Sequence, residues 1–378
     1  MEGITPKNLI RLSKSCIGDF EKKAVMEVLD REFLGMGAEV KKFEDMLSDF
    51  FGRPAVCVSS GTAALQLALQ ASGVGPDDEV IVQALTYVAS FQAITAVGAI
   101  PVACDVDSDS LCMDWHDAEK KITKNTKAIM PVHYSGGVGE LSEIYKLAKE
   151  NSLIVIEDAA HAFGSEYQGI RVGGFGDIAC FSFDGIKNIT SGEGGCIVSD
   201  DSKFLKKVRD ARLLGVENDS EKRYSNRRSW DFDVNHQGWR YHMSNLMAAI
   251  GIEQLKRFTI LANKRRKLSI QYNQQLSNLT DITLINHNYD QVVPHIFVVR
   301  FTSTLLRNHI SNKLNEYGIQ TGLHYKPNHL LSFYRTNSNL KNAEQVYSKL
   351  LSLPLHPDLK DTDVDLICNL IHRNINVI

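Results

Sequence analysis

The sequence predicts an α/β fold built on a mostly parallel sheet, and two observations support this prediction. First, apolar runs such as "EVIVQ" (79–83) and "LIVIEDAAHA" (153–162) alternate with helical periodicity, as in "GTAALQLALQASGV" (61–74). Second, the apolar runs have the length of short buried strands. Strands that alternate with helices of this length are typical of βαβ units, whose parallel sheet is buried on both faces.

The other elements of the first two-thirds continue this alternation. In chain order they are a helix at 86–99, a strand at 100–106, the segment "KAIMPVHYSG" at 127–136, a helix at 140–149, and strands at 177–183 and 194–201. One long helical pattern, from about 244 to 276, is then expected to lead out of the sheet.

The C-terminal third predicts a second, smaller α/β domain. It contains the apolar run "HIFVVRF" (295–301), a helix near 303–317 and two late helices. A chain of 378 residues is long enough for one large domain and one smaller one. We therefore expect a large domain over residues 1–250, with an N-terminal segment, and a small domain over residues 251–378.

The composition predicts an ordinary soluble protein. A net charge of -3 gives no electrostatic footprint for nucleic acid or for an anionic membrane, so neither partner is expected. The N-terminus has no apolar core of signal-peptide length, and no stretch approaches the roughly 18–20 apolar residues of a membrane helix. The polar stretch 215–238 is expected to be a long, structure-poor loop that is functional or mobile. A cytoplasmic location is expected.

Seven cysteines lie at scattered positions without a C-x-x-C pair, which argues against a disulfide framework or a structural zinc site. Cys57, Cys104, Cys180 and Cys196 lie in apolar runs, where a free thiol packs as a small hydrophobe. No metal site is expected.

The turn "SSGTAAL" (59–65) is a candidate anion cradle at the start of a helix. Ligands of open α/β sheets bind at the carboxyl ends of the strands, and this turn follows a strand. Gly61 and Thr62 allow backbone N–H groups to approach a phosphate at the helix N-terminus. The alternative is a plain helix cap, since Ser and Thr are common cap residues.

Three more candidates follow other strands. Asp158 ends an apolar strand, and a carboxylate buried there needs a cation or hydrogen bonds. The alternative is that Asp158 only caps the helix that follows. Lys187 follows the strand "CFSF", which contains Ser182. If apolar side chains surround Lys187, the pKa of its amine would fall from about 10.4, and the neutral amine could act as a nucleophile or base. Tyr87 could cover a flat ligand. The alternatives are a solvated lysine in a glycine-rich turn and a tyrosine packed in the core.

Taken together, these features are what pyridoxal phosphate (PLP) requires. The cofactor needs a phosphate cradle, an acid for its pyridinium nitrogen, an aromatic platform and a lysine that anchors it covalently. The same lysine is placed to move a proton between the carbon atoms of cofactor and substrate.

The motifs resemble those of the DegT/DnrJ family of sugar aminotransferases, which have the type I aspartate-aminotransferase fold. The resemblance runs from "LGMGAEVKKFE" (34–44) through "SSGTAALQLAL", "IEDAAHAFGSEYQG", "FGDIACFSFDGIKNITSGEGG" and "YHMSNLMAAIGIEQL" to "LSLPLHPDL" (351–359). It implies a mostly parallel seven-stranded sheet flanked by helices, a smaller C-terminal α/β domain and a homodimer.

The resemblance also implies roles for individual residues. Lys187 would anchor PLP, Asp158 would contact the pyridine nitrogen, and His161 would lie on the side of the phenolic oxygen. Gly61 and Thr62 would bind the phosphate with help from Ser182, and Tyr87 would stack on the ring. Candidates for the substrate end are Asp184, Gly185, His324, Tyr325 and Lys326, together with the 215–242 loop; the alternative is ordinary loop surface.

The chain departs from the family pattern at a few positions. Arg240 in "GWRYHMS" stands where relatives carry an Asn that reaches the phosphate from the neighbouring subunit. An arginine can also bind phosphate, although the alternative is a surface arginine. Gln83 replaces a frequent Pro, and "HYKPNH" replaces the more usual H-Y-x-P-L-H.

The resemblance implies an aminotransferase that moves an amino group from L-glutamate to a nucleotide-linked keto sugar. Relatives with His at the position of Lys187 are sugar dehydratases, so the lysine favours transamination. The expected substrate is dTDP-4-dehydro-6-deoxy-D-glucose, as in the viosamine-forming branch. The alternatives are a UDP- or GDP-linked sugar, a 3-keto sugar, or a non-catalytic regulator that binds PLP or a sugar nucleotide. A protein that binds nucleotides only through "SSGTAAL" lacks the lysine of a P-loop.

Overall fold

The computed structural model describes residues 9–375. Residues 1–8 of the expected large domain and residues 376–378 of the expected small domain therefore lie outside the described residues. Within them, no helix is both long and apolar enough to cross a membrane. All seven cysteines are free, and Cys57, Cys104, Cys180 and Cys196 are buried as expected.

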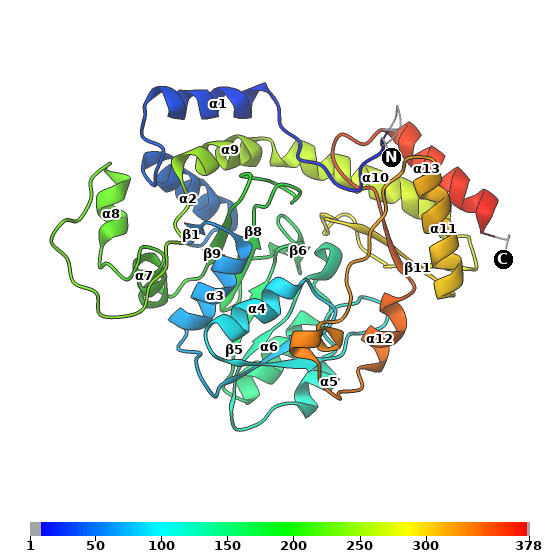
Figure 1. Ribbon diagram of the computed structural model, residues 1–378, viewed down its shortest axis with the longest axis horizontal. Helices are drawn as coiled ribbons and strands as arrows, with labels where there is room; N and C mark the ends of the chain where they lie inside the picture. Colours follow the sequence, from blue (N-terminus) through cyan, green and yellow to red (C-terminus); the bar gives the residue numbers. More distant parts are fainter. Residues whose placement is uncertain (1–8, 376–378) are drawn as a thin grey trace.

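A seven-stranded sheet forms the centre of the N-terminal two-thirds (Figure 1), with the order β1-β9-β8-β5-β4-β2-β3. Its strands are β1 (Ala55–Val58), β2 (Glu79–Gln83), β3 (Ile100–Cys104), β4 (Thr126–Met130), β5 (Ile154–Asp158), β8 (Ile178–Ser182) and β9 (Gly195–Val198). β9 runs antiparallel to its two neighbours, and the other pairs are parallel. The predicted mostly parallel seven-stranded sheet is confirmed.

Helices cover both faces of this sheet. The helices of this part of the chain are α1 (Asp19–Asp30), α2 (Ala38–Phe51), α3 (Gly61–Ala71), α4 (Val88–Ala96), α5 (Trp115–Lys120), α6 (Leu141–Glu150), α7 (Ser202–Ala211), α8 (Asp219–Tyr224) and α9 (Asn245–Lys256). Of these, α1 packs on α9, and α8 packs on α2 and α7. A short 3-10 turn, Tyr134–Gly136, and a small hairpin of β6 (Glu166–Tyr167) and β7 (Ile170–Arg171) complete this part.

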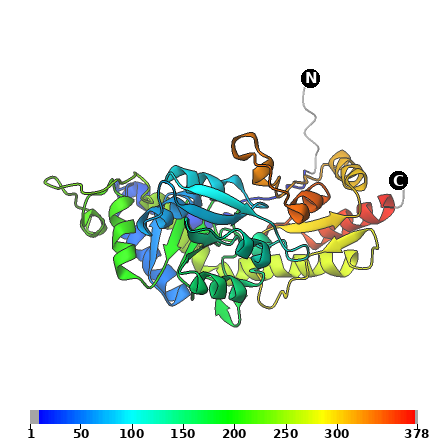
Figure 2. The same cartoon turned by 90° about the horizontal axis from the view of Figure 1, so that it is seen from below.

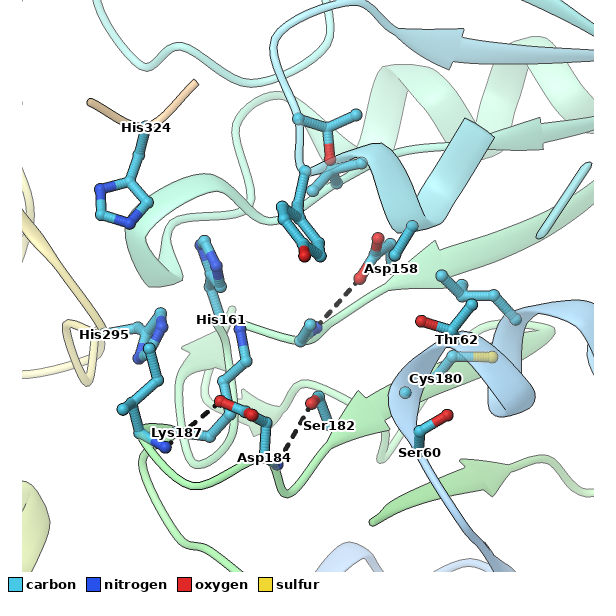
Figure 3. A pocket seen from close by; sticks show the side chains of 18 of the residues that line it. Ser60, Thr62, Asp158, His161, Cys180, Ser182, Asp184, Lys187, His295 and His324 are labelled. Atoms are coloured by element: carbon cyan, nitrogen blue, oxygen red, sulfur yellow. Dashed lines mark hydrogen bonds between the residues drawn. The ribbon is translucent and has the colours of Figure 1, made fainter. Parts of the chain in front are cut away.

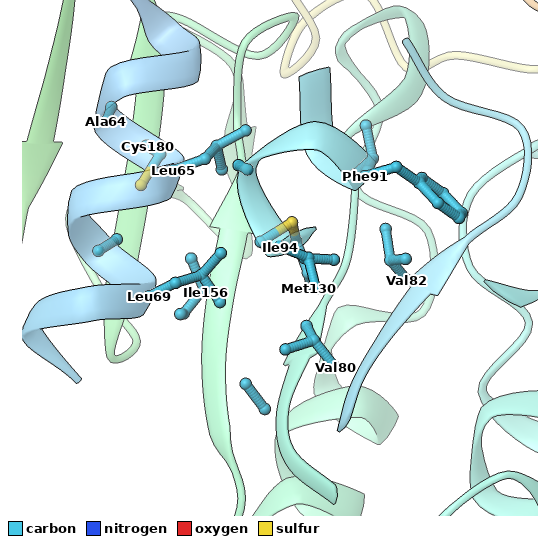
Figure 4. Packing of buried hydrophobic residues seen from close by; sticks show 14 of the residues in the cluster. Ala64, Leu65, Leu69, Val80, Val82, Phe91, Ile94, Met130, Ile156 and Cys180 are labelled. Carbon is cyan, nitrogen blue, oxygen red and sulfur yellow. The ribbon is translucent and has the colours of Figure 1, made fainter. Parts of the chain in front are cut away.

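Alternate residues of each strand point to opposite layers. Val80 and Val82 of β2 pack with Phe91 and Ile94 of α4 in one cluster (Figure 4), whereas Ile81 packs with residues of α5 and α6 on the other face. This period of two is that of a β-strand, and both directions are apolar because both faces are covered. The core therefore lies in two layers, one on each side of the sheet.

The C-terminal third forms a second sheet with its own helices, at one end of an elongated molecule (Figure 2). Its antiparallel strands are β10 (Ile282–Leu284), β11 (Phe297–Phe301) and β12 (Leu350–Leu353), and its helices are α10 (Phe258–Leu276), α11 (Thr304–Glu316), α12 (Lys341–Tyr347) and α13 (Asp361–Asn374). Two 3-10 turns, Asn328–Leu330 and Ser332–Tyr334, precede α12. The smaller α/β unit is present, and its boundary near residue 250 stays a prediction.

The prediction of one long helix over residues 244–276 is wrong. The structure has two helices, α9 and α10, which meet at Arg257 with φ −106° and ψ 12°. The break coincides with long-range contacts: Arg257 Nη2 donates to the carbonyl of Cys16, and its Nε lies 2.7 Å from Glu21 Oε1. Local periodicity cannot show such contacts, so the break was missed.

The stretch 215–238 was expected to be structure-poor, and this prediction is wrong for part of it. It contains α8, whose Tyr224 packs against an apolar cluster and is also attached to the core by hydrogen bonds. Arg212 donates to Tyr224 Oη at 2.8 Å, and Tyr224 donates to Glu44 Oε2 at 2.5 Å. Hydrophobic periodicity carries no signal for a helix anchored in this way.

Candidate active site

The strand ends that were expected to carry chemistry meet at one cavity of about 470 Å3 (Figure 3). Parallel strands place their carboxyl ends at the same edge, and the cavity lies at this edge. Most of the predicted residues line it: Gly61, Thr62, Tyr87, Asp158, His161, Ser182, Asp184, Lys187, His324 and Tyr325. A cavity of this size is typical of cofactor and small-molecule sites.

Lys187 lies in the loop between β8 and β9. The loop closes on itself, because Phe183 N donates to Gly194 O at 2.8 Å and Lys187 N donates to Asp184 O at 3.0 Å. Burial lowers the pKa of Lys187 to about 8, against the opposing effect of Asp158 and Asp184. The amine is therefore far more available as a nucleophile at neutral pH than an ordinary lysine.

Asp158 is a buried carboxylate, 5% exposed, at the end of β5. Ser90 Oγ donates to its Oδ2 at 2.7 Å, and Ala160 N donates to its Oδ1 at 3.2 Å. Thr86 Oγ1 lies 3.1 Å from Ser90 Oγ and extends the network. Among the described residues no cation forms an ion pair with Asp158, which leaves this carboxylate free to meet a cationic group of a ligand.

The N-terminus of α3 lies at the cavity wall. Ser60 caps the helix, with Ala63 N donating to its Oγ at 3.1 Å, so the capping alternative holds for this residue. Gly61 and Thr62 face the cavity beside Ser182. A Cβ on Gly61 would lie 2.8 Å from Ser182 Cβ, so only glycine lets the helix approach β8 this closely. No acidic residue occupies the first turn, as an anion requires.

Three imidazoles line the cavity on the side of Lys187. The rings of His161 and His295 lie 4.4 Å apart, and Tyr325 Oη is 3.1 Å from His161 Nε2. Burial, with a smaller effect of the Lys187 charge, lowers the pKa of His161 and His295 well below the usual value and that of His324 to about 4. All three are therefore neutral at pH 7, and the Nδ1 atoms of His161 and His295 are buried without a protein partner among the described residues.

Tyr87 lies at the N-cap of α4 and remains 59% exposed. Its ring centroid is 5.7 Å from that of Tyr325, with the ring planes 48° apart. The two rings therefore stand together at the cavity wall, and the alternative that Tyr87 packs in the core does not hold.

Three predicted residues do not line the cavity. Gly185 is next to it, and its carbonyl accepts a hydrogen bond from Ser15 Oγ at 2.5 Å. Lys326 and Arg240 are exposed, and Arg240 pairs with Leu213 in an isolated bridge. Their proposed roles at the substrate or phosphate stay predictions.

The sequence reasoning missed several residues of the site. Ser90 holds Asp158, and its position three residues after Tyr87, as a polar residue in an apolar helix, was a usable signal. His295 and Glu193 also line the cavity, but nothing in their local sequence indicates it. Glu193 faces the loop of Asp184, whose charge adds to the effect of burial and raises the pKa of Glu193.

A covered seven-stranded sheet with a buried lysine amine, a hydrogen-bonded carboxylate and an anion-binding helix end at one cavity defines a PLP-dependent aminotransferase. The family model of the DegT/DnrJ/EryC1/StrS aminotransferases matches residues 15–372. The chain belongs to this family.

Relatives agree with this assignment. The chain is 36% identical over 362 residues to the spore coat polysaccharide biosynthesis protein SpsC of Bacillus subtilis, with 92% of each chain covered. The PLP form of the putative sugar aminotransferase Spr1654 of Streptococcus pneumoniae superposes with a TM-score of 0.91 at 30% identity, covering 98% of this chain and 99% of the other. PseC, a Helicobacter pylori aminotransferase of pseudoaminic acid biosynthesis, gives a TM-score of 0.90 at 29% identity, covering 98% and 100%. The chain is a sugar aminotransferase that uses PLP.

The residues present fit PLP. The close approach that Gly61 allows leaves an anion-binding helix end in the cavity, and Asp158 offers a carboxylate to a cation. The unpartnered Nδ1 of His161 is a further polar group for a ligand. Across the described chain, no group of three or more His, Cys, Asp or Glu could hold a metal ion.

Proposed function

We propose that the protein transfers an amino group from L-glutamate to dTDP-4-dehydro-6-deoxy-D-glucose and so forms dTDP-4-amino-4,6-dideoxy-D-glucose. The product would serve as a precursor of a polysaccharide such as an O-antigen of lipopolysaccharide. The observation that carries the transfer reaction is Lys187, a reactive amine that lines the cavity. The names of SpsC and PseC, which place those proteins in polysaccharide and sugar-acid biosynthesis, support a sugar as acceptor.

We assign the residues as follows. Bound PLP supplies an electron sink that stabilises negative charge on the carbon next to the amino nitrogen. Lys187 Nζ holds the cofactor in the resting protein and, once displaced, takes and returns the proton at that carbon. Asp158, held by Ser90 and Ala160 N, keeps the pyridine nitrogen protonated.

The other cofactor contacts come from the cavity walls. Gly61, Thr62 and Ser182 would bind the phosphate of PLP, Tyr87 would cover its ring, and His161 would act as a neutral donor or acceptor on the side of the phenolic oxygen.

The substrate end of the site is assigned to the side of the cavity away from α3. Asp184, His324 and Tyr325 line the cavity, and Gly185 and Lys326 are assigned to the substrate end as their neighbours in the sequence. The protein would act as a homodimer, in which Arg240 and the 215–242 loop reach the phosphate and the nucleotide of the partner's site. The exposure of Arg240 in a single chain supports this arrangement.

A visible absorption spectrum tests the reaction class. Purified protein should show the band of covalently held PLP, L-glutamate should bleach it, and Lys187→Ala should lack it. Protein that never holds PLP would sink the proposal. A band that glutamate leaves unchanged would favour another amino donor or a non-catalytic regulator.

The acceptor is tested separately with a panel of dTDP-, UDP- and GDP-linked 4-keto-6-deoxy sugars and a 3-keto sugar. We expect the highest kcat/KM with the dTDP-linked 4-keto sugar. A tenfold preference for a UDP- or GDP-linked sugar, about 1.4 kcal/mol of transition-state binding, would replace the proposed nucleotide while leaving the reaction class intact.

A further inference from the structure

Arg265 is a fully buried arginine on α10, only 1% exposed, which has no role in the function proposed above. Its guanidinium donates to four backbone carbonyls. Nη1 donates to His295 O at 3.0 Å and to Leu355 O at 3.2 Å. Nη2 donates to Ile186 O at 3.3 Å and to Lys187 O at 3.4 Å.

These four carbonyls come from three segments that are far apart in the sequence. Two belong to the loop that carries Lys187, one to the entry of β11, and one to the segment after β12. One side chain therefore joins the lysine loop to the C-terminal sheet. The planar guanidinium fork can make these bonds together, whereas a lysine ammonium is a single point.

The charge of Arg265 has no counter-ion among the described residues, since none of their carboxylates forms an ion pair with it. The equally buried Arg212 shows the contrast, because its Nη1 lies 2.5 Å from Glu44 Oε1. Burial lowers the pKa of Arg265 to about 10, so the group is still charged at neutral pH. A buried charge without a counter-ion lowers the stability of the fold. The presence of Arg265 at this position therefore requires a reason other than stability.

We propose that Arg265 is a positioning residue for Lys187, because it fixes the peptide carbonyls on both sides of that lysine and places a permanent positive charge beneath its loop. The charge opposes protonation of the amine and so adds to the effect of burial. The inference rests on the proposed role of Lys187 as the reactive amine.

Other charged and titratable groups face Lys187 from each element around it. They are Asp184 and Glu193 of the β8–β9 loop, Asp158 at the end of β5, His161 after β5, His295 before β11, and His324 and Tyr325 before the first C-terminal 3-10 turn. Substitutions of Arg265 leave all of them in place. Because these groups are unchanged in the Arg265 variants, a change in the titration midpoint of Lys187 is assigned to the loss of Arg265.

The test measures the pH dependence of Lys187 reactivity in the full chain without added cofactor. Trace acylation with acetic anhydride across a pH series, read by peptide mass spectrometry, gives the titration midpoint of Lys187 against exposed Lys203. Arg265→Met should raise the midpoint by about one pH unit, since it removes the nearby like charge. Arg265→Lys should keep the midpoint and weaken PLP binding about tenfold, because it keeps the charge and loses the fork.

Arg266→Met is the matched control, because this neighbouring arginine donates to Val292 O at 3.2 Å and makes no hydrogen bond to the Lys187 loop. It should change neither the midpoint nor PLP binding. An unchanged midpoint in Arg265→Met, or an equal change in Arg266→Met, would overturn the electrostatic part. If Arg265→Met does not fold by circular dichroism, PLP binding as tight as in the wild type in Arg265→Lys would overturn the positioning part. A wild-type protein that binds PLP without transamination would count against the proposed function alone, because the acylation measurement involves no cofactor.

Discussion

At the scale of single residues, the site concentrates groups whose environment opposes their charged form. Lys187 is surrounded by cavity walls and by neutral imidazoles, and burial is the largest cause of its lowered pKa. The protein thus gives up stability to hold a reactive amine, as functional sites often do. This cost is measurable without any cofactor.

The pH dependence of stability follows from the sign of this shift. The pKa of Lys187 is about 8 in the folded protein and 10.5 for a free lysine, so the unfolded chain binds more protons between these values. Stability therefore rises with pH across this window, and below pH 8 the full penalty applies. Lys187→Met should stabilise the cofactor-free protein at pH 7 by roughly 2 kcal/mol, and the gain should vanish toward pH 10.5.

Urea denaturation of the cofactor-free protein at pH 7 and pH 10 checks this expectation. Lys203→Met, at an exposed position of α7, is the control and should leave the free energy of unfolding unchanged at both pH values. If Lys187→Met raised the free energy of unfolding equally at both pH values, the cause would be packing and not the charge of the lysine.

At the scale of elements, the turn between β2 and α4 is held by two amide side chains, those of Asn328 and Gln83. Asn328 is fully buried and its Nδ2 donates to Ala84 O at 3.2 Å and to Thr86 O at 2.8 Å. Gln83 donates to Leu85 O at 3.3 Å. These amides satisfy carbonyls of the turn that presents Tyr87, so the two side chains act together on one wall of the cavity.

Asn328→Leu tests this function of the turn. The change removes two donors to buried carbonyls, which should cost about 1–3 kcal/mol of stability. It should also weaken PLP binding several-fold, because the turn carries Tyr87 and leads into Ser90. Thermal denaturation and a fluorescence titration with PLP measure the two effects.

Asn342→Leu is the matched control, because Asn342 Nδ2 donates to Val106 O at 2.9 Å away from the cavity. It should lower stability and leave PLP affinity unchanged. Equal loss of PLP affinity in both variants would mean that Asn328 acts only through general stability.

The elements also show what the sequence could and could not predict. The strands of the large sheet and α3 and α4 were predictable, because apolar runs of length four or five between helical patterns record burial on both faces. The break at Arg257 was not, since α10 takes its direction from Phe258, which packs so closely on Gly164 that a Cβ there would lie 1.9 Å from the ring. Asp158 and Lys187 were predictable from strand ends, whereas His295 and Arg265 reach the site only through the tertiary fold.

At the scale of the whole molecule, a single chain leaves part of the proposed site uncovered. Tyr87 is 59% exposed at the cavity wall, and Arg240 is exposed outside it. Trp230 and Phe232, in the stretch between α8 and α9, are 85% and 56% exposed. Exposed apolar side chains of this size are typical of surfaces that contact another protein. These features favour the homodimer proposed above, with Arg240 acting on the partner's site.

Subunit complementation tests that arrangement. Lys187→Ala should be inactive and Arg240→Ala should bind PLP weakly, because each variant lacks one part of every site. In a symmetric dimer with Arg240 acting across the interface, a co-expressed heterodimer contains one site with both residues intact and one site with neither. Random pairing of equal amounts makes about half of the dimers mixed, so about one quarter of all sites should be active.

Activity at subsaturating PLP, measured on co-expressed and on separately purified then mixed variants, gives the result. Recovery to about one quarter of the wild-type rate in the co-expressed sample alone would place Arg240 in the partner's site. If Arg240 acted on its own chain's site, no site in any dimer would contain both Lys187 and Arg240, and the rate would stay at that of Arg240→Ala diluted by half. A monomer by light scattering would exclude action across an interface altogether, and Arg240 would then be an ordinary surface arginine.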